Sequence, residues 1–208
     1  MKHILVFSGS PRKEGNSDLL ADAFIYGAEK AGARVEKIRL IEINFSPCIE
    51  CGGCDDTGEC ILIDDMTPLY HKIEEADIVV LSSPMFFYNI TANAQALVER
   101  SQAFWVRQYV LKQGQIGGKR RQGIFLSVGA TKGRLLFDGS LRVMKYFFDA
   151  IGGRLSAAIL VRGVEKKGQI KQIKGVLQKA EKLGEAAATD SNYKKIDGIW
   201  LPGGIKNE

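Results

Sequence analysis

Short apolar runs alternate along the chain with longer stretches in which apolar residues recur every three or four positions. Residues 3–8 and 78–81 are almost wholly apolar, as in strands buried on both faces of a sheet. Residues 34–40, 123–128 and 155–161 are the other predicted strands. Five strands separated by helical stretches predict an α/β fold with a parallel sheet.

Helices are predicted between these strands and after the last one. The first begins near Ser17 and stops at Gly32, and two more cover about 66–76 and 92–106. Two further helices are indicated by apolar faces, the first made by Leu141, Met144, Phe148 and Ile151 and the second by Ile170, Ile173, Leu177 and Ala180. The stretch 43–65 follows neither period and is predicted to be a loop insertion.

Composition narrows the classes of protein to consider. The chain has 208 residues, of which 45% are hydrophobic and 25% charged, and a net charge of +5, so we expect a globular protein that favours anionic ligands such as phosphates. No apolar run is long enough to span a membrane, and the one at the N-terminus is too short for a signal peptide. We therefore expect a cytoplasmic protein without a membrane or nucleic-acid partner. The basic run 119–121 is interpreted as a solvated turn, and His3 and His71 as structural or solvent-facing.

The loop after the first predicted strand has the composition of a phosphate site. It joins a strand to a helix, where backbone N–H groups and the helix dipole favour an anion. It is neither a G-x-G-x-x-G nor a Walker sequence, which favours a single phosphate over a dinucleotide or nucleoside triphosphate. An ordinary polar turn remains the alternative. The candidate residues are Ser8, Ser10, Pro11, Arg12, Gly15, Asn16 and Ser17.

Two further loops follow the third and fourth predicted strands. The first contains four large residues after a proline, which is unusual for a turn. Their backbone could bind the edge of a flat aromatic ligand while their side chains pack on it; the alternative is that one or two of them plug the core. The candidates in this loop are Pro84, Met85, Phe86, Phe87, Tyr88 and Asn89, and those in the second are Ser127, Gly129 and Ala130.

Together the three loops resemble the FMN site of the NADPH-dependent FMN reductase family. Its phosphate loop has the pattern Ser-x-Ser-x-Arg/Lys…Asn-Ser/Thr, and its flavin loop has Ser-Pro-x-Tyr, matched here with Phe86 in place of the tyrosine. The resemblance implies a flavodoxin-like, doubly wound sheet in the order 2-1-3-4-5. It also implies FMN as the redox centre, without a catalytic side chain, and NAD(P)H as a possible donor. Residues 1–188 are then the FMN-binding domain and 189–208 a C-terminal tail.

All four cysteines lie within thirteen residues of the predicted insertion. Cys48, Cys51, Cys54 and Cys60 have the spacing C-x2-C-x2-C-x5-C, which resembles a ferredoxin cluster loop. Zinc sites usually pair two C-x2-C units across a long spacer. An iron-sulfur cluster is therefore favoured, and free thiols or a redox pair, and a structural zinc, are the alternatives.

The cysteine spacing also resembles the iron-sulfur flavoprotein branch of the same family. The resemblance implies a [4Fe-4S] cluster that exchanges electrons with FMN, supplied by NAD(P)H or a ferredoxin-type carrier. It further implies a homodimer or homotetramer, with the aromatic residues at 104–105 and 147–148 as candidate interface. The alternatives are a cluster-free reductase of quinones, azo dyes, metal ions or free flavin, a flavodoxin-like electron carrier, and a zinc-stabilised interaction domain.

Overall fold

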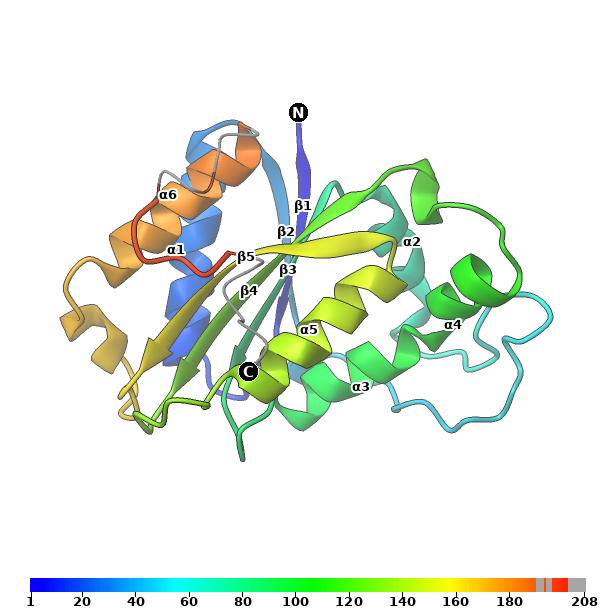
Figure 1. The fold of residues 1–208 in the computed structure, drawn as a ribbon, viewed down its shortest axis with the longest axis horizontal. Helices are drawn as coiled ribbons and strands as arrows, with labels where there is room; N and C mark the ends of the chain where they lie inside the picture. Colours follow the sequence, from blue (N-terminus) through cyan, green and yellow to red (C-terminus); the bar gives the residue numbers. More distant parts are fainter. Residues whose placement is uncertain (190–192, 194–195, 202–208) are drawn as a thin grey trace.

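A single parallel sheet of five strands forms the centre of the molecule (Figure 1). The computed structural model describes residues 1–189, 193 and 196–201. The strands are β1 (His3–Ser8), β2 (Arg34–Arg39), β3 (Ile78–Pro84), β4 (Arg121–Gly129) and β5 (Gly153–Arg162). Their order is β2-β1-β3-β4-β5 and every adjacent pair is parallel, which confirms the predicted flavodoxin-like fold.

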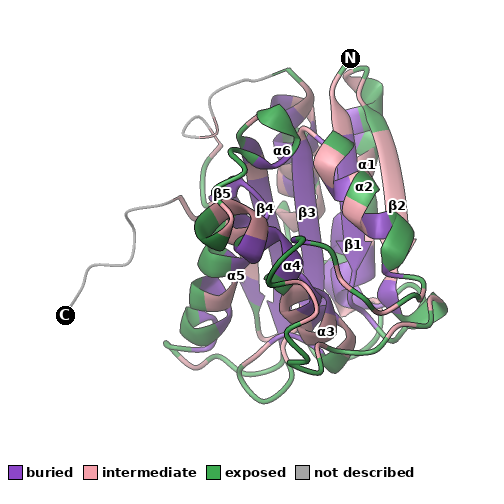
Figure 2. Ribbon diagram, turned by 90° about the vertical axis from the view of Figure 1, so that its right-hand side faces the viewer, coloured by how far each residue is buried: buried purple, intermediate pink, exposed green. Residues whose placement is uncertain are grey.

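Helices cover both faces of this sheet. On one face lie α1 (Asn16–Lys30) and α6 (Val176–Ala188), and on the other α2 (Thr67–Glu75), α3 (Ala92–Arg100) and α5 (Asp138–Ala150). Each face of the sheet has its own apolar core. Alternate residues of β1 belong to the two cores, because successive side chains of a strand point to opposite faces. Ile4 and Val6 pack with α1, whereas Leu5 and Phe7 pack on the other side, and all four are fully buried. Figure 2 shows β1, β3 and β4 as buried strands between the helical layers.

Two predicted helices have different boundaries in the structure. The predicted helix 92–106 is divided into α3, a short α4 (Gln102–Trp105) and a π-helical turn, Val106–Val110. The predicted helical face that began at Ile170 was wrong, because Ile170 lies in a separate 3₁₀ turn (Gln169–Gln172) and α6 begins only at Val176. Gly175, with a left-handed φ of 77°, separates the two segments, since few other residues adopt that conformation. Two more 3₁₀ turns are Leu40–Glu42 and Ile116–Gly118.

The burial of two groups of residues differs from what the sequence predicted. Arg121, predicted to lie in a solvated turn, is only 1% exposed and begins β4. Phe104, Phe147 and Phe148 are buried in the core of the single chain, so they are not available as the expected subunit interface. Of those four aromatic residues, Trp105 alone keeps an exposed surface.

The described part of the C-terminal tail pairs with the edge of the sheet. The backbone of Trp200 forms an antiparallel bridge with Ala158 of β5, with N–H···O distances of 2.8 and 3.0 Å. Trp200 packs on one core and Leu201 on the other, so this segment covers part of an otherwise open strand edge. Residues 202–208 of the tail lie outside the described residues. Within the described residues, no helix has the length and apolar character needed to cross a membrane.

Candidate functional site

The three candidate loops meet at the carboxyl ends of β1, β3 and β4. Gly9 of the first loop donates its N–H to the carbonyl of Ser82 in β3 (2.7 Å) and accepts a hydrogen bond from the Thr91 hydroxyl (2.8 Å). Met85 of the second loop donates its N–H to Val128 at the end of β4 (2.8 Å). This edge of the sheet is where open α/β folds bind their ligands.

The first loop ends at a helix N-terminus that lacks a capping side chain. Gly15 caps α1 without a side-chain hydrogen bond, and the first N–H groups of a helix have no partner within it. The hydroxyl of Ser17 is buried and has no partner in the described chain. A Cβ atom at Gly15 would lie 2.9 Å from the Ser10 hydroxyl, so only glycine leaves the loop this tight. These features fit an anionic group such as a phosphate.

Some of the predicted phosphate donors have partners inside the protein. The Ser8 hydroxyl donates to Asp18 (3.0 Å), and the Asn16 amide donates to the carbonyl of Lys166 (2.9 Å) and accepts from the N–H of Ile170 (3.2 Å). These two residues therefore hold the loop in place. Pro11 and Arg12 are exposed, and Ser10 bonds the backbone of Arg12.

A network of ion pairs and hydrogen bonds centred on Asp18 supports the first loop. Its carboxylate lies 2.8 Å from both Lys37 Nζ and Arg39 Nη1 and accepts the N–H of Glu14 (3.0 Å). Burial alone would raise the pKa of Asp18, but the hydrogen bond and charge of Lys37, the Glu14 amide and Arg39 outweigh it. The pKa therefore lies below its ordinary value, and Asp18 stays ionised under the loop.

The Asp18→Asn substitution should lower stability at neutral pH and flatten its dependence on acid. A carboxyl whose pKa is depressed by folding stabilises the protein above its unfolded pKa, about 4, and that contribution is lost as pH falls through the folded pKa. We expect a loss of about 2 kcal/mol at pH 7 and a smaller further loss below pH 4 than in the wild type. Urea unfolding from pH 7 to 3 measures both. Asp22→Asn is the control, since Asp22 is half exposed and also pairs with Lys37; equal acid slopes for wild type and Asp18→Asn would refute the assignment.

The second loop is a tight turn with exposed aromatic side chains. Phe86 and Asn89 close it through two backbone hydrogen bonds of 2.8 and 3.0 Å. Phe87 and Tyr88 between them have φ of 49° and 63°, which is strained for large residues. Their N–H groups have no acceptor in the described chain. Phe86, Phe87 and Tyr88 are 50%, 103% and 52% exposed, so none of the three plugs the core.

The third loop is fixed mainly by packing. The Ser127 hydroxyl donates to the carbonyl of Ser83 (2.8 Å), which joins it to the second loop. A Cβ atom at Gly129 would lie 2.6 Å from Leu136 Cδ2 and 3.4 Å from Met85 Cβ, so the chain itself requires glycine there. Ala130 is exposed beside it.

The four cysteines are free and line one hollow of about 520 Å³, together with residues of α3 and α4. Burial, followed by the charge of Asp55, raises the pKa of the Cys54 thiol. Within the described residues, no three potential ligands converge on the position of one metal ion. A cubane cluster needs a wider arrangement, since each thiolate binds a different iron. The N–H of Glu50 donates to Cys48 Sγ (3.4 Å), a contact of the kind that tunes clusters.

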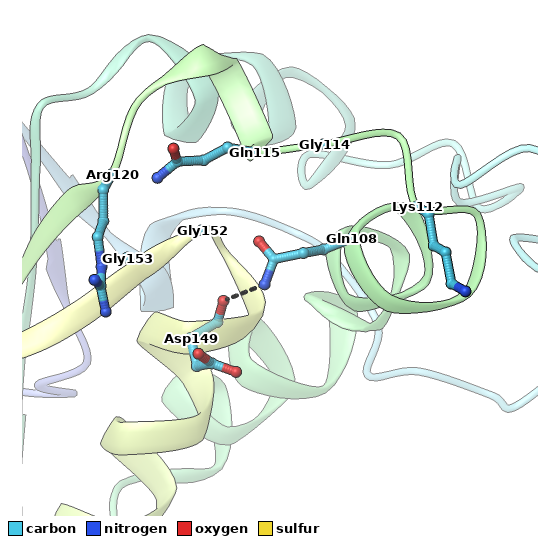
Figure 3. A pocket seen from close by; sticks show the side chains of 8 residues that line it. All are labelled: Gln108, Lys112, Gly114, Gln115, Arg120, Asp149, Gly152 and Gly153. Atoms are coloured by element: carbon cyan, nitrogen blue, oxygen red, sulfur yellow. Dashed lines mark hydrogen bonds between the residues drawn. The ribbon is translucent and has the colours of Figure 1, made fainter.

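Another hollow, of about 570 Å³, lies at the opposite edge of the sheet (Figure 3). It is bordered by the amino end of β5 and by the C-terminal turn of α5, where Gln108 donates to the carbonyl of Asp149 (3.4 Å). Its position at the amino ends of the strands separates it from the three loops.

Several residues of the site were not predicted. Thr91 joins two loops, and Asp18 and Arg39 support the phosphate loop. Arg100 anchors the cysteine loop, with its side chain fully buried. Asp18, Arg39 and Arg100 become partners of these loops only through tertiary contacts.

Comparisons of the sequence with known proteins agree on one family. Residues 2–151 match the family described as NADPH-dependent FMN reductase. The chain is 36% identical over 110 residues to an iron-sulfur flavoprotein of Archaeoglobus fulgidus, covering 53% of this chain and 49% of that protein. It is 34% identical over 124 residues to one of Methanocaldococcus jannaschii, covering 58% and 64%. The matches thus span between half and two thirds of these relatives.

Solved structures agree on the fold. An NAD(P)H:quinone oxidoreductase from Methanothermobacter marburgensis superposes with a TM-score of 0.69 over 88% of this chain and 98% of the other, at 16% identity. A flavone reductase superposes with a TM-score of 0.65 over 96% of this chain and 65% of the other, at 18% identity. At such identities these neighbours establish the architecture alone.

Proposed function

The chain belongs to the NADPH-dependent FMN reductase family, in its iron-sulfur flavoprotein branch, and from this premise we propose that it is an FMN-dependent oxidoreductase with a [4Fe-4S] cluster on its four cysteines. Electrons would come from NAD(P)H or a ferredoxin-type carrier. Residues 1–188 would form the FMN-binding domain, with 43–65 as the cluster loop, and the protein would act as a homodimer or homotetramer.

FMN binding, the first part of this proposal, is supported by the uncapped N-terminus of α1 and the aromatic turn beside it. The backbone N–H groups of residues 16–17, the unpartnered hydroxyl of Ser17 and the exposed Arg12 would hold the phosphate. The N–H groups of Phe87 and Tyr88, which have no acceptor in the described chain, would stabilise negative charge on the ring system. The aromatic side chains of that turn would pack on the rings and exclude water.

The shared hollow of the four thiols supports the cluster half. Cys48, Cys51, Cys54 and Cys60 would each bind one iron. When bound, FMN supplies two-electron chemistry and the cluster one-electron chemistry. Helix α3 starts directly after the flavin loop and ends at the cysteine hollow. Its nine residues span about 14 Å, so one rigid element links the two sites.

Anaerobic reduction tests the proposal. Wild-type protein and the Cys54→Ser variant would be titrated with NADPH, and separately with reduced ferredoxin, while the visible spectrum is recorded. Before reduction we expect flavin bands in both proteins and thiolate-cluster absorbance in the wild type alone, and we expect the flavin bands to bleach in both proteins during the titration. Flavin bands that neither reductant changes would overturn the oxidoreductase assignment. Identical spectra of the two proteins outside the flavin bands would remove the cluster and leave a flavin reductase.

Tyr88→Gly should make the free protein more stable and its flavin binding weaker. Glycine removes the left-handed strain, a gain of about 1 kcal/mol, while loss of the ring costs about 0.5–1.5 kcal/mol of aromatic packing, or about two- to tenfold in Kd. Lys112→Gly is the matched control, because Lys112 has a φ of 51° on a loop at the opposite edge. Unfolding and FMN titrations measure both effects; equal FMN affinities in wild type and Tyr88→Gly would show that the Tyr88 ring does not pack on the flavin.

A further inference from the structure

One arginine at the end of α3 joins the two stems of the cysteine loop. Arg100 Nη1 donates to the carbonyl of Ser46 (3.0 Å), two residues before the first cysteine, and Nη2 donates to the carbonyl of Leu62 (3.3 Å), two residues after the last. Both nitrogens also bind Asp64, at 2.6 and 3.2 Å. The planar guanidinium with its several fixed donors suits this task, and a lysine would not reproduce it. Arg100 therefore closes the loop at its base.

The same arginine contributes charge to the cysteine hollow. Arg100 lines the hollow, and it is the single cation among the described residues that do so, whereas Glu50, Asp55 and Glu99 are acidic. Its partner Asp64 is not among the lining residues, so of this ion pair only the arginine borders the hollow that the thiols line. Its Nε is buried without a partner in the described chain.

We propose that Arg100 is a positioning residue that closes the cysteine loop and, as the cation of the hollow, raises the reduction potential of the cluster held there. The redox part of this inference rests on the proposed function. Reduction adds one electron, taken from the flavin or the carrier, to a group already negative through four thiolates. A fixed positive charge in a site of low polarity favours the reduced form over the oxidised one.

A second arginine contacts the loop without facing the hollow. Arg107, in the π-helical turn, donates from Nε to the carbonyl of Gly58 (2.9 Å) and forms an ion pair with Glu74. It lies outside the set of residues that line the hollow. Arg107→Met is therefore a control that loosens the loop and leaves the charge beside the thiols unchanged.

Potentiometric titration of reconstituted protein tests the redox part. Arg100→Met should lower the cluster potential, so that the ratio of reduced to oxidised cluster at the wild-type midpoint falls about tenfold, a shift of about 59 mV for one electron. Asp64→Asn should raise it, because the arginine charge is then no longer neutralised. Arg100→Lys keeps the charge and should stay near the wild type. If the methionine variant does not fold, the upward shift expected for Asp64→Asn decides the redox role. Shifts of the same sign in Arg100→Met and Asp64→Asn, or none, would overturn the redox role.

Hydrogen exchange of the metal-free protein tests the anchoring part separately. Arg100→Met and Arg100→Lys should both speed exchange across residues 46–62, since both lose the fork of hydrogen bonds, whereas Arg120→Met should not. Unchanged exchange in both Arg100 variants would overturn the anchoring role. If wild-type protein takes up no iron, the proposed cluster fails together with the redox role, and exchange alone decides the anchoring.

Discussion

Replacing Arg121 with methionine is expected to lower the free energy of unfolding by about 4 kcal/mol or more. The buried guanidinium donates to the carbonyls of Ile73 (2.7 Å), Ile116 (2.7 Å), Ile151 (2.9 Å) and Glu74. Methionine fills a similar volume but leaves these four acceptors without a donor, and each buried unsatisfied group costs about 1–3 kcal/mol. The arginine thus ties three segments to the start of β4.

Arg120→Met is the matched control for this prediction. Arg120 is the neighbouring residue, exposed beside the hollow of Figure 3, so its loss should change stability by no more than about 0.5 kcal/mol. Urea unfolding of the two variants and the wild type gives the comparison. Similar stabilities of the two variants would contradict the structural role of Arg121.

Replacing Gly184 with alanine is expected to destabilise the protein by about 2–3 kcal/mol. Helices α1 and α6 approach through two glycines. A Cβ atom at Gly184 would overlap the carbonyl oxygen of Phe24, and one at Gly27 would overlap that of Glu181. Because a Cβ at Gly184 would overlap a backbone oxygen, alanine would force the helices apart, and the overpacking cost should lie at or above the upper end of the usual range of about 1–3 kcal/mol, at about 3–4 kcal/mol. A gain of about 1 kcal/mol in helix propensity offsets part of this cost, which leaves about 2–3 kcal/mol.

Gly139→Ala in α5 is the control that separates the cost of the steric clash from the gain in helix propensity. The nearest atom to a Cβ there is the carbonyl oxygen of Tyr88, at 3.5 Å, an ordinary contact. This variant should be as stable as the wild type or up to about 1 kcal/mol more stable. Thermal unfolding of both variants measures the difference. A Gly184→Ala protein that is as stable as Gly139→Ala would show that α1 and α6 do not pack this closely.

The strands could be predicted because burial on both faces leaves continuous apolar runs, as in β1 and β3. Helix boundaries were harder to predict from the sequence. The break at Gly175 depends on a single left-handed residue, and the division between α3 and α4 falls at Ser101, whose φ of −72° and ψ of −1° still lie in the right-handed helical region. Arg121 was misread because a run of three basic residues resembles a solvated surface, whereas its partners are carbonyls distant in sequence.

The meeting of the three loops could be predicted from their positions, since the carboxyl ends of adjacent parallel strands share one edge. The contacts of each side chain could not. Ser8 and Asn16 are suited chemically to bind phosphate, yet their partners are Asp18 and the 166–170 segment. The use of Arg100 at the cysteine loop likewise depends on how α3 packs, and no local pattern encodes it.

The content of iron, sulfide and FMN per chain, measured after purification without oxygen, tests the central claim most directly. We expect about one FMN with about four irons and four sulfides, and visible absorbance from both groups. Flavin without iron would contradict the cluster on the four cysteines. A chain that holds neither, even after reconstitution with FMN, iron and sulfide, would contradict the assignment of the three loops as a flavin site.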